Sequence, residues 1–368
     1  MSLTEEIQQA RKKVVTDGYE MSLGEIISLY KNKELVIDPV FQRLFRWDDE
    51  RKTRFIESII LGIPVPPIFV YQDENGVWEL VDGLQRLSTV LQLTGDLRVE
   101  PPKVLESLVL NGTRFLPSLN NKRWRDSEST ADDGLGQALQ IEIKRARIRV
   151  EILKSESDVS AKYELFQRLN TGGAKLTEQE VRNSIAVSLN KEFYEWLVAR
   201  SEDRDFIVTT AQTKAALESQ MGIELVLRFL AFRHIEYVPG LDVHEYLDDA
   251  LFRLASDPKL DLRREEEIFE RTFSYLEEAL EEYAFKKWNG TEFTGKFLMS
   301  LFEVIAVGVA QNLPALTKLT ADRRRTVIMK NAQKLWANKI FLANSGAGVR
   351  GTTRLSRLLP LAAKAMKP

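Results

Sequence analysis

The residue types best suited to chemistry stand together in the stretch Asp82-Gly83-Leu84-Gln85-Arg86. An apolar run precedes it and apolar residues at helical spacing follow, which predicts a strand that passes into a helix at Gly83. The first turn of a helix carries free N–H groups and the positive end of the dipole, so it attracts anions. Arg86 does not offset that dipole, which favours a phosphate partner, because guanidinium and phosphate pair bidentately. The alternative is a surface arginine paired with a nearby acid.

Two further stretches combine polar side chains with turn residues. Gln42 and Arg43 stand in a loop flanked by aromatic residues, and Arg168 and Asn170 precede a pair of glycines. Arginines that converge on one helix N-terminus would bind a polyphosphate, with Asp82 available to hold Mg²⁺ or position a water molecule. Each stretch also has a structural interpretation, since Asp82 could cap a helix and the glycine turn could end one.

Hydrophobic periodicity predicts the elements that position these residues. Strands are expected at 35–37, 68–71, 77–81 and 146–152, helices at 49–61 and 84–95, hairpins at Asn75-Gly76 and Asn111-Gly112, and a helical or loose lead-in over 1–19. Beyond residue 158, helices are expected at 161–169, 177–189, 191–200, 211–233, 244–255, 263–285, 293–310 and 322–341. The expected class is α+β, with a mixed domain over 1–155 followed by an all-helical domain over 156–368.

Composition excludes several classes of site. The 368 residues contain no Cys and only two His, His234 and His244, so a disulfide framework, a thiol nucleophile and a Cys-based metal centre are excluded. The charged N-terminus does not read as a signal peptide, and no uninterrupted apolar run is long enough to span a membrane. A soluble cytoplasmic protein without membrane contact is therefore expected.

Charge is unevenly distributed although the net charge is only −2. Residues 318–368 hold twelve Lys or Arg and one acid, whereas residues 261–282 are strongly acidic. The basic region suits DNA, and Arg350, Arg354 and Arg357 are the first phosphate-contacting candidates. Alternatively, the basic region neutralises the acidic stretch, within the chain or in another subunit.

Together the three stretches resemble the N-terminal family of GmrSD-type restriction enzymes, whose fold is akin to ParB and sulfiredoxin. The family motifs are QR-x-(aromatic)-x-W, DGQQRL(S/T)T and LNxGGxxL(S/T). They match Gln42–Trp47, Asp82–Thr89 and Leu169–Thr177 in this order, within a resemblance that covers about residues 20–190. A ParB/sulfiredoxin-like N-terminal domain is therefore expected.

The resemblance implies a nucleoside triphosphate and Mg²⁺ as cofactors, with nucleotide binding and hydrolysis. The implied phosphate-binding residues are Gln42, Arg43, Gly83, Arg86, Arg168 and Asn170. Asp82 and Gln85 would be catalytic, holding the metal or the attacking water. Leu84 replaces the first Gln of the family motif, and its spacing with Leu87 and Leu91 indicates a core position rather than a lost ligand.

Many relatives carry a C-terminal His-Asn-His nuclease, and this sequence lacks the histidines for one. The chain is thus expected not to cut DNA alone. It is expected to act as a sensor or regulatory subunit of a prokaryotic restriction or anti-phage system, with a nuclease or toxin supplied in trans. A non-hydrolysing DNA- or protein-binding module on the same scaffold is the alternative, and a homo-oligomer is left open.

Overall fold

The computed structural model describes residues 2–12, 15–37, 47–98, 107–126, 132–154, 178–213, 216, 220–346 and 348–368. The chain divides into two compact units, Met1–Lys175 and Leu176–Pro368. Residues 155–177, just beyond the predicted border, lie outside the described residues.

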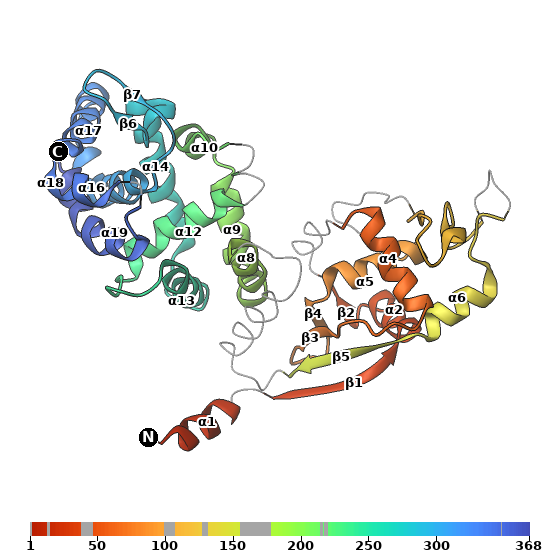
Figure 1. Ribbon diagram of the computed structural model, residues 1–368. Coiled ribbons are helices and arrows are strands. Elements are labelled where there is room, and N and C mark those ends of the chain that lie inside the picture. Colours follow the sequence, from red (N-terminus) through yellow and green to blue (C-terminus); the bar gives the residue numbers. More distant parts are fainter. Residues whose placement is uncertain are drawn as a thin grey trace. The chain divides into compact units, whose positions relative to one another are not determined.

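A five-stranded mixed sheet forms the first unit (Figure 1). Its strands are β1 (Thr16–Ser22), β2 (Leu35–Val36), β3 (Ile68–Gln72), β4 (Trp78–Asp82) and β5 (Arg147–Leu153). Their spatial order is β1-β5-β3-β4-β2, with β1–β5 and β3–β4 antiparallel and β3–β5 and β2–β4 parallel. In β5, Ile148, Val150 and Ile152 are buried and alternate with more exposed charged residues, so one face of the sheet carries the core.

Helices gather on one side of this sheet (Figure 1). They are α2 (Leu23–Lys31), α4 (Asp49–Ile60), α5 (Leu84–Thr94) and α6 (Gly136–Arg145), while α1 (Leu3–Lys12) precedes β1. Side chains cap the N-termini of α2 and α4: Ser22 accepts a hydrogen bond from the N–H of Glu25, and Asp48 accepts one from the N–H of Arg51. Local capping chemistry therefore determines where the helices beside the site begin.

Two expectations for the first unit are wrong. The lead-in contains β1, whose mostly exposed side chains carry no alternating pattern and whose register comes from pairing Tyr19 with Val150. No strand flanks Asn111-Gly112 among the described residues; instead the chain turns through a 3₁₀ helix, Pro117–Leu119, and the N–H of Gly112 donates to the Asn120 side chain. Helix α6 was not expected.

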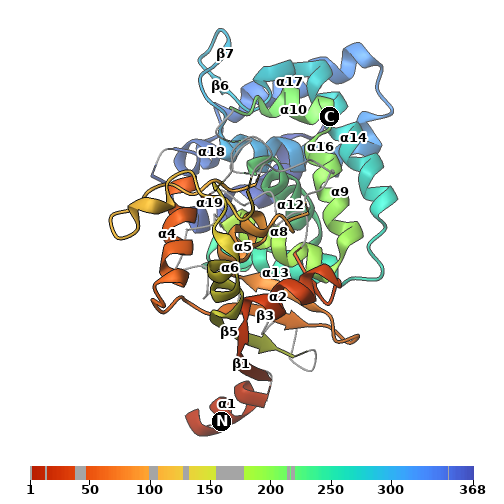
Figure 2. The same ribbon diagram turned by 90° about the vertical axis from the view of Figure 1, so that its right-hand side faces the viewer.

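The second unit is mostly helical (Figures 1 and 2). Its helices are α8 (Glu178–Leu189), α9 (Lys191–Ser201), α10 (Arg204–Thr210), α12 (Met221–His234), α13 (Val243–Ala255), α14 (Leu262–Leu280), α15 (Met299–Leu301), α16 (Val307–Leu316), α17 (Ala321–Leu335), α18 (Lys339–Asn344), α19 (Gly351–Leu358) and α20 (Ala362–Ala365). Four buried phenylalanines centre its core, with Phe269 and Phe273 at 4.5 Å between ring centroids and Phe206 at 4.9 Å from Phe273. Phe229 completes this cluster.

Helix bounds in the second unit differ from expectation at several places. Within the helix expected at 211–233, α12 begins at Met221, and α10 was missed. The helix expected at 322–341 ends at Leu335, and α18 and α19 were not expected. A small hairpin, β6 (Lys287–Trp288) with β7 (Phe293–Thr294), occupies the start of the helix expected at 293–310. Gly290 at φ +105° and the Asn289 side chain, which accepts from two following N–H groups, form its turn.

One stretch of the described residues, Met299–Leu316, is long and apolar enough to cross a membrane. Since 72% of it is buried inside the structure, it has the character of a core helix. The predicted class is confirmed as a mixed N-terminal unit followed by a helical one.

Candidate functional site

Strand β4 passes directly into helix α5 at Gly83, as the sequence predicts. Gly83 has φ +101°, a conformation that side chains other than glycine rarely adopt. A Cβ atom there would also lie 2.6 Å from Cγ2 of Ile68 on the neighbouring strand. Two independent constraints therefore require glycine at this junction, and both come from the fold.

Asp82 and Arg86 form an ion pair across the junction. Nη2 of Arg86 lies 2.7 Å from Oδ2 of Asp82 and donates a second hydrogen bond of 2.9 Å to the carbonyl of Pro67. The Arg86 side chain is only 16% exposed, and its buried Nε finds no partner among the described residues. Arg86 thus pairs with a nearby acid, the alternative to a phosphate partner that the sequence left open. The pair holds the guanidinium beside the first turn of α5.

Gln85 links the first two motifs. Its Oε1 accepts a 3.0 Å hydrogen bond from the backbone N–H of Trp47, the last residue of the first motif. The Trp47 ring packs edge-on against Phe55 of α4 at 5.8 Å. Trp47, the end of the first motif, is thus attached to the strand–helix junction through Gln85.

The remaining predicted ligands of the first and third motifs fall outside the described residues; they are Gln42, Arg43, Arg168 and Asn170. Leu84 is only 9% exposed and belongs to the core, as its helical spacing predicts. The change from the family glutamine is therefore a core change in this chain.

The junction suits a phosphate group. Helix α5 has no side-chain cap at its N-terminus and no acid in its first turn, so the positive end of its dipole lies beside Arg86 without a compensating carboxylate in that turn. Asp82 could supply one carboxylate to Mg²⁺, which takes one or two protein carboxylates when phosphate oxygens complete its shell. Among the described residues no group of three His, Asp or Glu side chains could hold a metal without such help.

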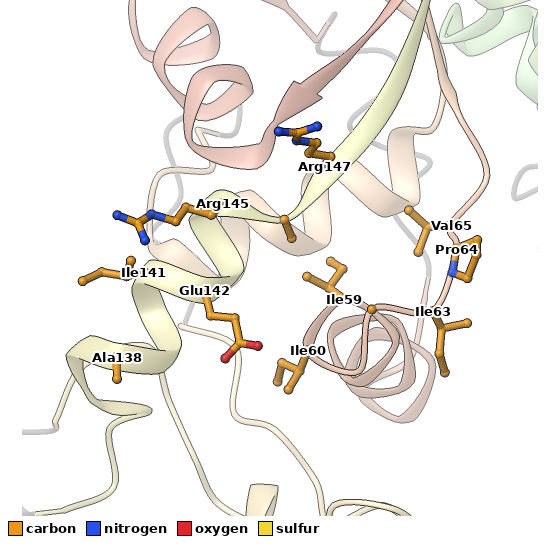
Figure 3. A pocket seen from close by; sticks show the side chains of 12 residues that line it. Ile59, Ile60, Ile63, Pro64, Val65, Ala138, Ile141, Glu142, Arg145 and Arg147 are labelled. Atoms are coloured by element: carbon orange, nitrogen blue, oxygen red, sulfur yellow. The ribbon is translucent and has the colours of Figure 1, made fainter.

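A separate pocket of about 580 Å³ lies between α4, the loop after it and α6 (Figure 3). Ile59, Ile60 and Ile141 line it, and Figure 3 shows Glu142 pointing toward the α4 side. None of its lining residues belongs to the three motifs. Its lining is mixed, because Glu142, Arg145 and Arg147 stand beside the isoleucines.

The three arginines proposed for DNA contact have different surroundings. Arg354 lies 2.7 Å (Nε) and 3.0 Å (Nη2) from the two carboxylate oxygens of Glu303, whose side chain is fully buried. This bidentate pair favours a structural role for Arg354. Arg350 and Arg357 are exposed and remain available for an external partner.

A buried charge network in the second unit was not anticipated from the sequence. Arg182 of α8 has a fully buried side chain and meets Asp248 and His244 at 2.8 Å and Glu224 at 3.4 Å. Arg228 bonds to Glu224 at 2.7 Å and approaches Glu303 at 3.7 Å. The network thus connects α8, α12 and α13 to the Glu303–Arg354 pair. No local signal in the sequence marks it, because its members are far apart in the chain.

The acids of this network differ in their electrostatics. Burial raises the pKa of Asp248 to about 7. Burial alone would raise the pKa of Glu224, but Arg228 and Arg182 outweigh that effect and lower it. His244 accepts at Nδ1, because a guanidinium can only donate, so its neutral ring carries the proton at Nε2. His244 therefore has a structural partner, as does His234, whose Nε2 lies 3.1 Å from Glu265.

Comparison with known proteins agrees with the motif resemblance. Residues 23–187 match the family model described as GmrSD restriction endonuclease, N-terminal domain. A solved Pnob8-like ParB-N domain is similar at 11% identity with a TM-score of 0.25, over 90% of this chain and 96% of that one. No curated protein matches. The family match over residues 23–187 confirms the resemblance to the GmrSD N-terminal family for this region of the chain.

Proposed function

We propose that the chain binds a nucleoside triphosphate with Mg²⁺ at the junction between β4 and α5, and that it hydrolyses this nucleotide. In this proposal the protein is a cytoplasmic sensor or regulatory component of a restriction or anti-phage system. A separate nuclease or toxin then acts on the foreign DNA.

The observation that carries the proposal is the arrangement of Gly83, Arg86 and the uncapped first turn of α5 inside the region matched to the family. An anion at this turn would receive backbone N–H groups and a guanidinium already held in place by Asp82 and Pro67. Mg²⁺, when bound, would supply charge neutralisation at the phosphates. Asp82 would hold it, and the turn with Arg86 would orient the phosphates.

A non-hydrolysing DNA- or protein-binding module is the second candidate. The Asp82–Arg86 ion pair favours it, because a carboxylate that neutralises the guanidinium internally needs no ligand. The two candidates differ in whether an added nucleotide displaces this pair.

Nucleotide titration by calorimetry, with and without Mg²⁺, tests the proposal. We expect ATP or GTP to bind the full chain and Arg86→Ala to weaken binding at least tenfold, since a charge-assisted bidentate contact is worth about 1.5–3 kcal/mol. Phosphate release, measured with and without DNA, tests hydrolysis.

Arg54→Ala is a matched control for this titration. Arg54 also forms an i,i+4 ion pair with an acid, Glu50, but both side chains are about 70% exposed on α4. The control should bind nucleotide as the parent does and retain the same thermal midpoint. Equal affinity of the parent and Arg86→Ala would contradict the assigned site.

A further inference from the structure

Acidic residues of α14 are neutralised mainly by arginines that lie outside the basic C-terminal region. Arg200 pairs with Glu266 at 2.7 Å and Glu270 at 2.6 Å, and Arg204 pairs with Glu277 at 3.2 Å. Of the basic residues in 318–368, Arg324 alone pairs with α14 within the described part of the chain, at 2.9 Å from Glu278. Among the residues that the structure describes, most of the charge of the basic region therefore has no compensating carboxylate.

Lys330 and Lys334 form part of that uncompensated charge. They stand four residues apart on α17, so they project from the same side of the helix, and both are exposed. No carboxylate among the residues that the structure describes lies within ion-pair distance of either lysine. Such a lysine pair is suited to successive phosphates of a polyanion.

A pocket of about 540 Å³ lies directly beside this lysine pair. It is lined by Lys287, Trp288 and Asn289 of the β6–β7 hairpin and by Gln333 and Trp336 at the end of α17. Lys330 and Lys334 stand seven and three residues before Ala337, which also lines the pocket, so this helical spacing puts them on the pocket side of α17. Figure 2 shows the hairpin projecting from the helices of the second unit beside α17.

The pocket has the components of a base-binding site. Each indole is half-buried: Trp288 packs on Phe293 at 4.8 Å between ring centroids, and Trp336 packs on Phe341 at 5.4 Å. Supported aromatic rings of this kind offer stacking surface to any nucleobase, and side-chain amides offer hydrogen bonds to its edge. Lys287 lies 5.8 Å over the Trp336 ring and adds a further cation at the rim.

We propose that this surface binds single-stranded nucleic acid. One unstacked base enters the pocket between Trp288 and Trp336, while Lys330, Lys334 and Lys287 hold the adjoining phosphates. The aromatic pair favours a single strand over an acidic protein, because an acidic peptide has no need of a stacking surface. This site lies within the second unit and is independent of the proposed nucleotide site.

Fluorescence anisotropy of a labelled oligothymidylate of about 15 nucleotides, a length within the range for such sites, tests the proposal on the full chain. Trp288→Ala should weaken binding about 5- to 150-fold, the value of one lost base stack, and Trp288→Phe should restore most of it. Lys330→Glu combined with Lys334→Glu should weaken binding and reduce the salt slope by about 1.4, for two phosphates at about 0.7 each.

The matched control combines Lys364→Glu with Lys367→Glu, the same charge change at two other exposed lysines of the basic region. This control should bind the oligonucleotide within about twofold of the parent, which separates the site from the general positive charge of the region. Absence of binding at low salt, equal weakening by the control, or no effect of Trp288→Ala would overturn the proposal. So would duplex DNA or polyglutamate competing as well as the single strand.

Discussion

The carboxylate of Asp82 and the guanidinium of Arg86 meet at 2.7 Å across the first turn of α5. This carboxylate provides the negative charge that a phosphate would provide in a nucleotide complex. Arg86 is thus pre-oriented by Asp82, and a nucleotide must share or take over that contact. Arg86 would then pair with Asp82 in the empty site and with a phosphate in the nucleotide complex.

Replacing Asp82 with Asn separates its two proposed tasks. The substitution removes the charge that competes for Arg86, so Mg²⁺-free nucleotide affinity should rise by about 1.5- to 5-fold, the value of a modest ion pair. Mg²⁺-dependent phosphate release should fall at least 100-fold, because the carboxylate proposed to hold the metal is gone. Calorimetry without metal and a phosphate-release assay with metal check the two effects. Reduced affinity without metal would contradict this division of roles.

Gly83→Ala should destabilise the first unit by about 2–5 kcal/mol, from positive-φ strain and from overpacking against Ile68. Gly95→Ala is the matched control, since Gly95 has φ +77° but no atom within 4 Å of an added Cβ. It should cost only about 1–2 kcal/mol of backbone strain. Thermal and urea unfolding of both variants measure the difference. If both variants lose the same free energy of unfolding, the Ile68 side chain moves aside for the added Cβ without an energetic cost.

Leu84→Gln, which restores the family residue, should destabilise the chain rather than create activity. The side chain is 91% buried, so an amide there loses apolar burial and leaves polar groups unpaired, at a cost of about 2–4 kcal/mol. Leu84→Met should cost less than about 1.5 kcal/mol. Unfolding midpoints compare the two. A Leu84→Gln variant with full stability and higher phosphate release would place this residue at the nucleotide.

Arg354→Ala should destabilise the second unit by about 3 kcal/mol or more, because it leaves the fully buried Glu303 without its bidentate partner. Arg357→Ala, three residues away and exposed, should change stability by less than about 0.5 kcal/mol. Thermal unfolding distinguishes the two arginines. If Arg354→Ala leaves the stability unchanged, Arg354 becomes a candidate again for contact with an external phosphate.

Acid should destabilise the second unit partly through Glu265. Burial alone would raise the pKa of Glu265, but hydrogen bonds from His234 and Arg233 lower it below the ordinary value. A lowered folded-state pKa means that this stabilisation is present above about pH 4.3, the unfolded value, and is lost as the pH falls through the folded value. Glu265→Gln should therefore flatten the midpoint-versus-pH curve below about pH 5.

Glu267→Gln serves as the control for this pH dependence, because Glu267 is exposed on the same helix. Its curve should follow that of the parent. At pH 7 Glu265→Gln should also cost about 1–3 kcal/mol, since Arg233 loses a charged partner. A variant curve as steep as the parent curve would assign the acid sensitivity to other groups.

Local signals in the sequence were sufficient to predict the strands, helices and turns around the candidate site. The strand-to-helix change at Gly83, the cap at Asp48 and the turn at residues 73–76 each depend on neighbours within a few residues. Backbone conformation and capping act over that range, so they can be read without a structure. The burial of Leu84 follows from the same periodicity.

Long-range partners were decided only by the tertiary structure. The register of β1 comes from β5, more than a hundred residues away, and the partner of Arg354 comes from Glu303 on another helix. The sequence alone offered two uses for Arg86, and the fold placed it against Asp82 and the carbonyl of Pro67. Composition and spacing thus determined which residues can do chemistry. Packing decided which charges neutralise one another and which, such as Lys330 and Lys334, have no carboxylate partner in the described part of the chain, because ion pairing requires proximity in space rather than in sequence.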